Sequence, residues 1–184
     1  MPMPNEQTYT AEEFLRLTAD SEQRQELIDG AIIAQASPGQ KHQELVGGLY
    51  AAIRSYIRAN NGNCKPFISP FDVKLNEYNV VIPDVLVVCD PSKLDGKRCN
   101  GAPDWVIEVT SSNYKYDVTA KLLLYKETGV REYWIVDPEN QKVFVYHFEQ
   151  SMNAVQFYDF DQPIPVGIYK DAPVQLTINI SEVL

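Results

Sequence analysis

Apolar residues recur at helical spacing in two long stretches of the chain. Between residues 41 and 59 they return every third or fourth position, which predicts a long helix. An amphipathic pattern over residues 117–128, ended by Gly129, predicts a second long helix. Near the start, the segment Thr10-Ala11-Glu12-Glu13 is typical of a capped helix opening and predicts a short helix that ends around residues 20–21.

Short apolar runs of strand length occupy most of the remaining chain. Two such runs within residues 25–33 surround Asp29-Gly30, which is typical of a tight hairpin. Residues 80–88 are nearly all apolar and predict a central strand, and residues 65–75 alternate in the manner of another strand. Further strands are predicted over residues 104–110, 132–136 and 142–148, a polar surface loop over residues 93–102, and edge strands and turns in the proline-containing tail.

This order of elements predicts an α/β (α+β) fold in which the two long helices pack against a mixed sheet. The sequence contains no internal repeat, low-complexity segment or interdomain linker. A chain of 184 residues is most simply one domain, spanning residues 1–184, and is long enough to bury a substantial core.

The charge and the cysteines narrow the classes of function. A net charge of -9 argues against a broad basic surface for nucleic acid and against electrostatic docking on anionic membranes. It remains compatible with a nucleic-acid enzyme that works through a local groove and a bound cation. The three cysteines, Cys64, Cys89 and Cys99, lack metal-ligand spacing, and their odd number predicts a reduced compartment. With no signal-peptide pattern and no apolar run near the ~20 residues that span a bilayer, a cytoplasmic location is expected.

Two carboxylates stand in strands that are otherwise apolar. Alternate residues of a strand share a face, so Glu108 points to the same side as Val106, and Asp84 stands between Ile82 and Leu86. Buried charge is costly unless it is paired or binds a cation, and carboxylates of adjacent strands can hold a Mg²⁺ ion. Lys121, on the following helix, could orient a water or neutralise developing charge. Alternatively, Asp84 follows a proline bend and Glu108 ends its strand in water.

Other polar residues have a weaker claim to the same site. Asp117 and Lys121 are spaced to share one helix face, but an acid in a first helical turn is also ordinary. Glu26 lies in the hairpin and His42 begins the first long helix, where a capping role is common. His147, in an exposed-looking strand, shows no sign of a function. The sequence has no nucleophile elbow, P-loop, dinucleotide fingerprint or zincin motif, and two histidines are too few for a Ser-His-Asp triad.

These residues and their order resemble those of a known protein family. Pro83-Asp84 followed by Glu108-Val109-Thr110 resembles the PD-(D/E)XK nuclease superfamily. The surrounding sequence is similar to the Uma-two (Uma2) family of putative restriction endonucleases over essentially the whole chain, from about residue 9 to residue 184. The segments that carry this resemblance include Glu26-Leu27-Ile28-Asp29-Gly30, His42, Ser111, Asp117, Lys121, Tyr125 and residues 129–138.

The resemblance implies a restriction-endonuclease-like core, a central four-stranded mixed β-sheet flanked by the two long helices, with extra N- and C-terminal strands. It implies that Asp84 and Glu108 bind Mg²⁺ or Mn²⁺. The lysine of the wider superfamily is replaced by Thr110 here, and Lys121 on the next helix takes its place. The implied activity is a metal-dependent endonuclease that hydrolyses phosphodiester bonds of nucleic acid, with DNA expected. Homodimers would suit cuts across two strands.

The remaining candidates have supporting roles in this interpretation. Glu26 and Asp117 are second-shell or second-metal groups, and His42 contacts a substrate phosphate. Two other functions stay open from the residues alone. One is a catalytically silent nucleic-acid-binding or protein-interaction module on the same fold, for which the carboxylates are dispensable. The other is a metal-independent hydrolase, for example of glycosidic bonds, that uses Asp84 and Glu108 as acid and base.

Overall fold

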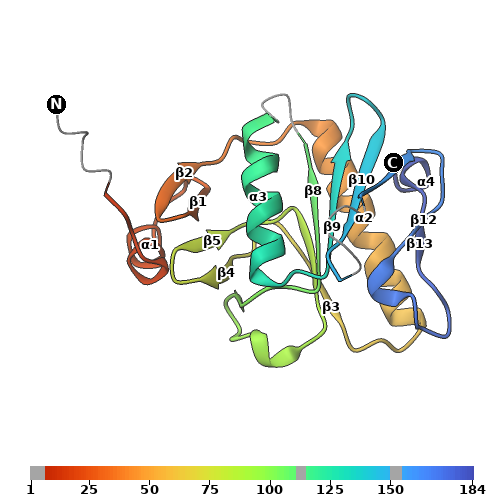
Figure 1. The fold of residues 1–184 in the computed structure, drawn as a ribbon, viewed down its shortest axis with the longest axis horizontal. Helices are drawn as coiled ribbons and strands as arrows, with labels where there is room; N and C mark the ends of the chain where they lie inside the picture. The colour runs from red at the N-terminus through yellow and green to blue at the C-terminus, as the bar shows by residue number, and fades with distance from the viewer. Residues whose placement is uncertain (1–6, 111–114, 150–154) are drawn as a thin grey trace.

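The structure is a computed structural model that describes residues 7–110, 115–149 and 155–184, with only the backbone of residues 115–119. Its elements form two mixed sheets and a small two-stranded ribbon, with few helices (Figure 1). In chain order they are α1 (Ala11–Leu17), β1 (Gln25–Ile28), β2 (Ala31–Ala34), α2 (Gln40–Ala59), β3 (Lys65–Ile68), β4 (Val73–Asn76), β5 (Asn79–Val81), β6 (Val85–Val88), η1 (Pro91–Lys93), β7 (Cys99–Asn100), β8 (Trp105–Val109), α3 (Lys115–Thr128), β9 (Glu132–Asp137), β10 (Lys142–His147), β11 (Val155–Asp159), β12 (Ile164–Pro165), η2 (Gly167–Tyr169), β13 (Thr177–Ile178) and α4 (Ile180–Val183).

The larger sheet has six strands in the order β11-β10-β9-β8-β6-β3. Strands β8 and β9 pair in parallel because α3 connects them as a crossover, and the other neighbours pair antiparallel. The mixed sheet is therefore confirmed, and β10 and β11 continue it beyond β9 to a total of six strands.

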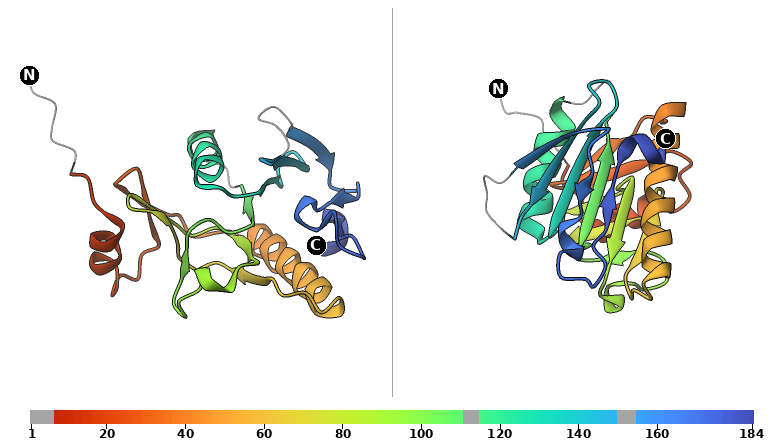
Figure 2. Two further views of the ribbon diagram at one scale, coloured as in Figure 1. Left: turned by 60° about the horizontal axis from the view of Figure 1, so that its bottom comes forward. Right: turned by 90° about the vertical axis from the view of Figure 1, so that its right-hand side faces the viewer.

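The two long helices cover opposite faces of this sheet (Figures 1 and 2). Trp105, Ile107 and Val109 of β8 pack in the core that contains the apolar residues of α2. Val106, between them, packs in the second core with residues of α3. The alternation predicted for this strand is confirmed, and Glu108 accordingly faces α3.

The second sheet has the order β2-β1-β5-β4-β7 and shows where the predicted strands were too long. The single strand expected over residues 80–88 is wrong: β5 belongs to the second sheet and β6 to the larger one. Pro83 lies between them and has no N–H to continue a ladder. The strand expected over residues 65–75 is likewise two strands, β3 and β4, in different sheets. Between residues 65 and 88 the chain thus crosses twice between the sheets.

Several local predictions hold. Thr10 caps α1 in a capping box with Glu13, although that helix ends at Leu17, earlier than expected. The hairpin of β1 and β2 turns at Asp29 and Gly30, whose φ values are 49° and 80°. The predicted loop 93–102 contains the short strand β7. In the described ranges of the chain, every helix is too short or too polar to cross a bilayer.

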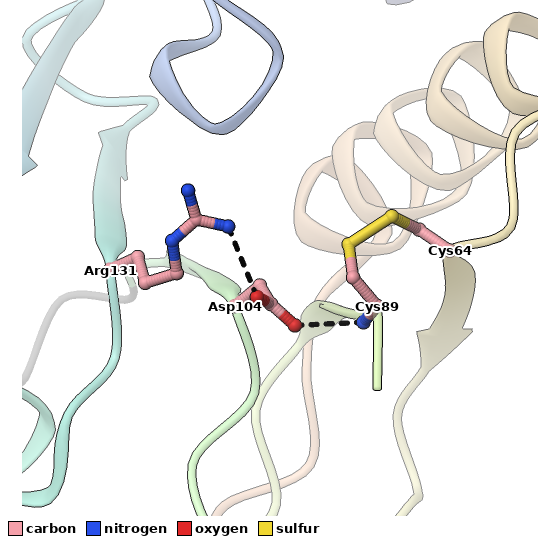
Figure 3. Close-up of a disulfide and its surroundings, with 4 residues drawn as sticks. All are labelled: Cys64, Cys89, Asp104 and Arg131. Carbon is pink, nitrogen blue, oxygen red and sulfur yellow. Dashed lines mark hydrogen bonds and ion pairs between the residues drawn. A yellow bond between two sulfur atoms is a disulfide. The ribbon is translucent and has the colours of Figure 1, made fainter. Parts of the chain in front are cut away.

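The expectation of reduced cysteines is wrong for two of them. Cys64 and Cys89 form a disulfide, with Cα atoms 3.9 Å apart (Figure 3). They lie opposite each other because the antiparallel pairing of β3 and β6 aligns the neighbouring residues. The amide of Cys89 donates to Asp104 Oδ2 at 2.7 Å, and Arg131 donates to the other oxygen of Asp104 at 3.2 Å (Figure 3). The disulfide therefore adds a covalent link between the edge strand β3 and its neighbour β6.

Candidate functional site

A cavity of about 280 Å³ opens where the ends of the two sheets meet. The break between β5 and β6 contributes Asp84, the end of β8 contributes Glu108 and Thr110, and α3 contributes Lys121. The first turn of α2 contributes His42. The hairpin and the segment that joins it to α2, residues 33–39, form a further part of the wall. The remaining lining residues are Arg24, Ile82, Val109 and Tyr133.

Glu108 is held by side chains of the helix that covers its face of the sheet. Its Oε1 accepts hydrogen bonds from Lys121 Nζ at 3.2 Å and from the Tyr125 hydroxyl at 2.8 Å. Both donors project from α3, four residues apart, so they occupy the same side of the helix. The amide of Asp84 lies 3.4 Å from Glu108 Oε2, which links the two carboxylate positions directly.

Asp84 occupies the point at which the chain leaves one sheet for the other. Its Oδ2 accepts the amide of Val109 at 2.9 Å and lies 3.0 Å from His42 Nε2. None of the described residues donates to the other oxygen, Oδ1. The carboxylate is therefore fixed in orientation on one side and keeps an oxygen available for a ligand.

Glu26, in the first strand of the hairpin, is fully buried. Its Oε1 accepts the amide of Ile82 at 2.7 Å, a donor left without a ladder partner by the break at Pro83. Its Oε2 accepts Gln35 Nε2 at 2.7 Å. Lys121 Nζ lies 3.0 Å from both oxygens, which makes a buried ion pair beside Glu108.

Burial and neighbouring charges alter the protonation of two of these groups. Burial raises the pKa of Glu108 to about 7, with further increases from Asp84 and Glu26, while Lys121 and the Tyr125 hydrogen bond act in the opposite direction. Burial disfavours the charged form of His42, but the hydrogen bond and the charge of Asp84 outweigh it, and the pKa of His42 is raised. A positive charge that enters the cavity would therefore stabilise the ionised form of Glu108.

The structure brings most of the predicted residues together. Asp84, Glu108, Lys121 and Glu26 form one continuous set of contacts, which His42 joins through Asp84. In addition, the cavity wall includes Thr110, whose amide donates to Val136 O at 2.9 Å. The side chain of Asp117 lies outside the described residues.

His147 was wrongly expected in an exposed strand. It is buried, with Nδ1 3.8 Å from Glu132 Oε1, in a cluster separate from the cavity.

Sequence reasoning assigned no role to two residues of this region. Tyr125 donates to Glu108, and its spacing of four from Lys121 is the signal that could have identified it. Arg24 lines the cavity. Its position two residues before Glu26, and hence on the same face of an extended chain, is a comparable signal.

The donor set fits a magnesium-type cation. Mg²⁺ prefers oxygen ligands and is commonly held by one or two carboxylates, with water and substrate completing its coordination. Asp84 and Glu108 offer such a pair on one cavity wall. Within residues 7–110, 115–149 and 155–184, no group of three or more His, Cys, Asp and Glu side chains is arranged to hold a metal ion.

Comparison with known proteins gives a family and a related structure. The Uma2 family, described as "Putative restriction endonuclease", matches residues 11–173, which include every residue discussed above for the cavity. A crystal structure from Anabaena variabilis ATCC 29413, of a putative nuclease belonging to DUF820, is similar with a TM-score of 0.77 and 25% sequence identity. The match covers 95% of this chain and 96% of that chain. No curated protein sequence matches.

Proposed function

The chain belongs to the Uma2 family of putative restriction endonucleases, and we propose that it is a metal-dependent endonuclease. The proposed reaction is hydrolysis of phosphodiester bonds of nucleic acid, with DNA as the proposed substrate. One observation carries this proposal. Asp84 and Glu108 line a single cavity, and Lys121 is held 3.2 Å from Glu108 by a buried partner. Two carboxylates that can hold a cation, with a lysine that can neutralise developing charge, suit metal-assisted phosphoryl chemistry.

The wider fold supports the same assignment. We infer that β9, β8, β6 and β3, with α2 and α3 on their two faces, form the four-stranded restriction-endonuclease-like core. Strands β10 and β11 then extend it at one edge, and the N-terminal hairpin belongs to the second sheet. Asp84 and Glu108 come from the ends of two neighbouring strands of this core.

Each side chain has a distinct part in the proposed reaction. Asp84 and Glu108 hold Mg²⁺ or Mn²⁺, which when bound supplies charge stabilisation and a more acidic water. Lys121 donates a hydrogen bond to the attacking water or to a phosphoryl oxygen. Glu26 positions the ammonium group of Lys121, and His42 orients the carboxylate of Asp84.

For cuts in both strands of a duplex we propose that two copies act together, because one such cavity serves one scissile phosphate. The net charge of -9 disfavours tight nonspecific binding to a duplex. The proposed substrate contact is accordingly local, at the cavity and its rim.

The test is cleavage of supercoiled, linear and single-stranded DNA and of RNA, with Mg²⁺, Mn²⁺ or EDTA. Wild type is compared with Glu108→Gln, which keeps the shape of the side chain and removes its charge. Glu12→Gln, on the exposed face of α1, is the matched control. The proposal requires metal-dependent cleavage that Glu108→Gln abolishes and Glu12→Gln retains.

Other results have defined meanings. Equal cleavage by wild type and Glu108→Gln would show that Glu108 is not needed for the reaction, or that a contaminating nuclease is responsible. Absence of cleavage by wild type on every substrate would favour a catalytically silent module on this fold. Hydrolysis of another bond in EDTA would favour the metal-independent alternative.

A further inference from the structure

Arg24 is a cation of the cavity that has no carboxylate partner among the described residues. It lies directly before β1 and contributes to the wall that also contains Asp84 and Glu108. Its one side-chain hydrogen bond within the described ranges runs from Nη2 to the hydroxyl oxygen of Ser69, at 2.6 Å. Its Nε is buried without a partner. Most of the donors of this guanidinium are therefore not used by the described part of the protein.

The position of Arg24 is fixed by neighbours on both sides. Its carbonyl accepts the amide of Gln35 across the hairpin at 2.9 Å, which anchors the backbone. Ser69, which holds the guanidinium, donates its own amide to the carbonyl of Asp84 at 3.0 Å. The charge of Arg24 also works against the raised pKa of His42, as expected of a cation close to that ring. The guanidinium is thus held beside the backbone of Asp84, near the proposed reaction centre.

Among the described residues, no carboxylate forms an ion pair with this guanidinium. A half-buried guanidinium with a neutral hydroxyl as its partner gives up part of its hydration without an ion pair in return. Lys121, by contrast, lies between two carboxylates of the same cavity. The planar fork of arginine matches phosphate oxygens in bidentate geometry, and such charge-assisted hydrogen bonds are among the strongest in proteins.

We propose that Arg24 binds a non-bridging oxygen of a substrate phosphate at the cavity, and that it is a substrate-binding residue of the site. This inference rests on the proposed endonuclease function and adds a phosphate contact from the β1 side of the cavity to the roles given above to Asp84, Glu108 and Lys121. The phosphate belongs to the nucleic-acid backbone, so the contact contributes affinity and register and is independent of base sequence.

The experiment compares Arg24→Gln and Arg24→Lys with wild type. Binding of a short fluorescein-labelled DNA duplex, its single strand and the matching RNA is followed by fluorescence anisotropy, with Ca²⁺ in place of Mg²⁺, over a range of salt concentrations. Cleavage of the same probes is followed with Mn²⁺. Arg58→Gln is the matched control, since Arg58 is exposed in the last turn of α2, about 24 Å along the helix from His42.

The expected result has three parts. Arg24→Gln raises the Kd for the bound probe by about tenfold or more, since a charge-assisted hydrogen bond is lost. It also makes the negative slope of log K against log salt shallower by about one, because one phosphate contact is removed. Arg24→Lys is intermediate, since it keeps the charge and loses the fork, and Arg58→Gln behaves as wild type. The salt slope is a readout that a purely structural role of Arg24 would not change.

The failures of the two proposals are distinguishable. If wild type cleaves its substrate and Arg24→Gln binds it with unchanged Kd and salt slope, the role of Arg24 is refuted and the endonuclease function stands. If wild type neither binds nor cleaves any probe, both are refuted. Thermal unfolding of each variant shows whether a change in binding accompanies a loss of folded protein.

Discussion

Replacing Glu108 with glutamine should stabilise the protein at the same time as it removes the proposed activity. Burial raises the pKa of this carboxyl from its ordinary 4.5 to about 7, even though Lys121 and Tyr125 favour the ionised form. The folded protein therefore holds the proton of Glu108 more tightly than the unfolded chain does. Stability contributed by this group is present at low pH and is lost as the pH rises from about 4.5 through about 7.

The size of the effect follows from that shift. At about 1.4 kcal/mol per pKa unit, keeping Glu108 ionised near pH 8 costs the folded state about 3 kcal/mol relative to a neutral side chain. Near pH 5 the folded carboxyl is neutral already, and the difference falls to about 1 kcal/mol. Glutamine is neutral and can still accept the Tyr125 hydroxyl, so Glu108→Gln should gain most of this free energy of unfolding near pH 8 and little near pH 5.

The assay is urea unfolding of wild type and Glu108→Gln near pH 5 and near pH 8 in EDTA, which keeps divalent cations out of the comparison. Glu12→Gln, exposed on α1, controls for the loss of a charge. A Glu108→Gln protein that is less stable than wild type near pH 8 would refute the reasoning, because the ion pair with Lys121 would then outweigh burial. A gain of equal size at both pH values would show that ionisation is not its cause.

Three further predictions concern the same network and the disulfide. Tyr125→Phe removes the 2.8 Å hydrogen bond to Glu108, which should raise the pKa of Glu108 and move the acid limb of the pH–rate profile to higher pH. Glu26→Gln removes a negative charge that raises the pKa of Glu108, so it should move the acid limb to lower pH. It should also reduce kcat, because Lys121 loses its buried partner. Movement of the limb in the same direction by both variants would contradict this account. Cys64→Ser opens the disulfide, whose cysteines are 25 residues apart, and should lower the free energy of unfolding in urea by about 3 kcal/mol. Wild type treated with dithiothreitol should behave like Cys64→Ser, and an unchanged midpoint for both would show that the disulfide does not stabilise the fold.

The local elements were within reach of sequence reasoning. Helical periodicity identified α2 closely, and Asp29-Gly30 identified the hairpin, because both signals depend on residues a few positions apart. The alternation of β8 correctly placed Glu108 on the face opposite Trp105. Spacing places Tyr125 on the helix face of Lys121, but its contact with Glu108 could be seen only in the structure, since helical position gives a face and not the group that the face contacts.

The points at which the chain passes from one sheet to the other could not be predicted from the sequence. Nine consecutive residues around Pro83 are mostly apolar whether they form one strand or two, because both sheets bury them. Only the pairing partners show that β5 and β6 belong to different sheets. The hydrogen bond of buried Glu26 depends on this break, because the amide of Ile82 donates to Glu26 and not to a neighbouring strand.

The sequence by itself determined the family and the strand and helix faces of the candidate site residues. The tertiary structure alone decided which of them meet: Glu26 with Lys121, Asp84 with His42, and Cys64 with Cys89. The physical reason is that periodicity records the direction of burial at each position. Contacts between residues dozens of positions apart depend on strand register and on the crossing of the chain between sheets, and neither leaves a local pattern.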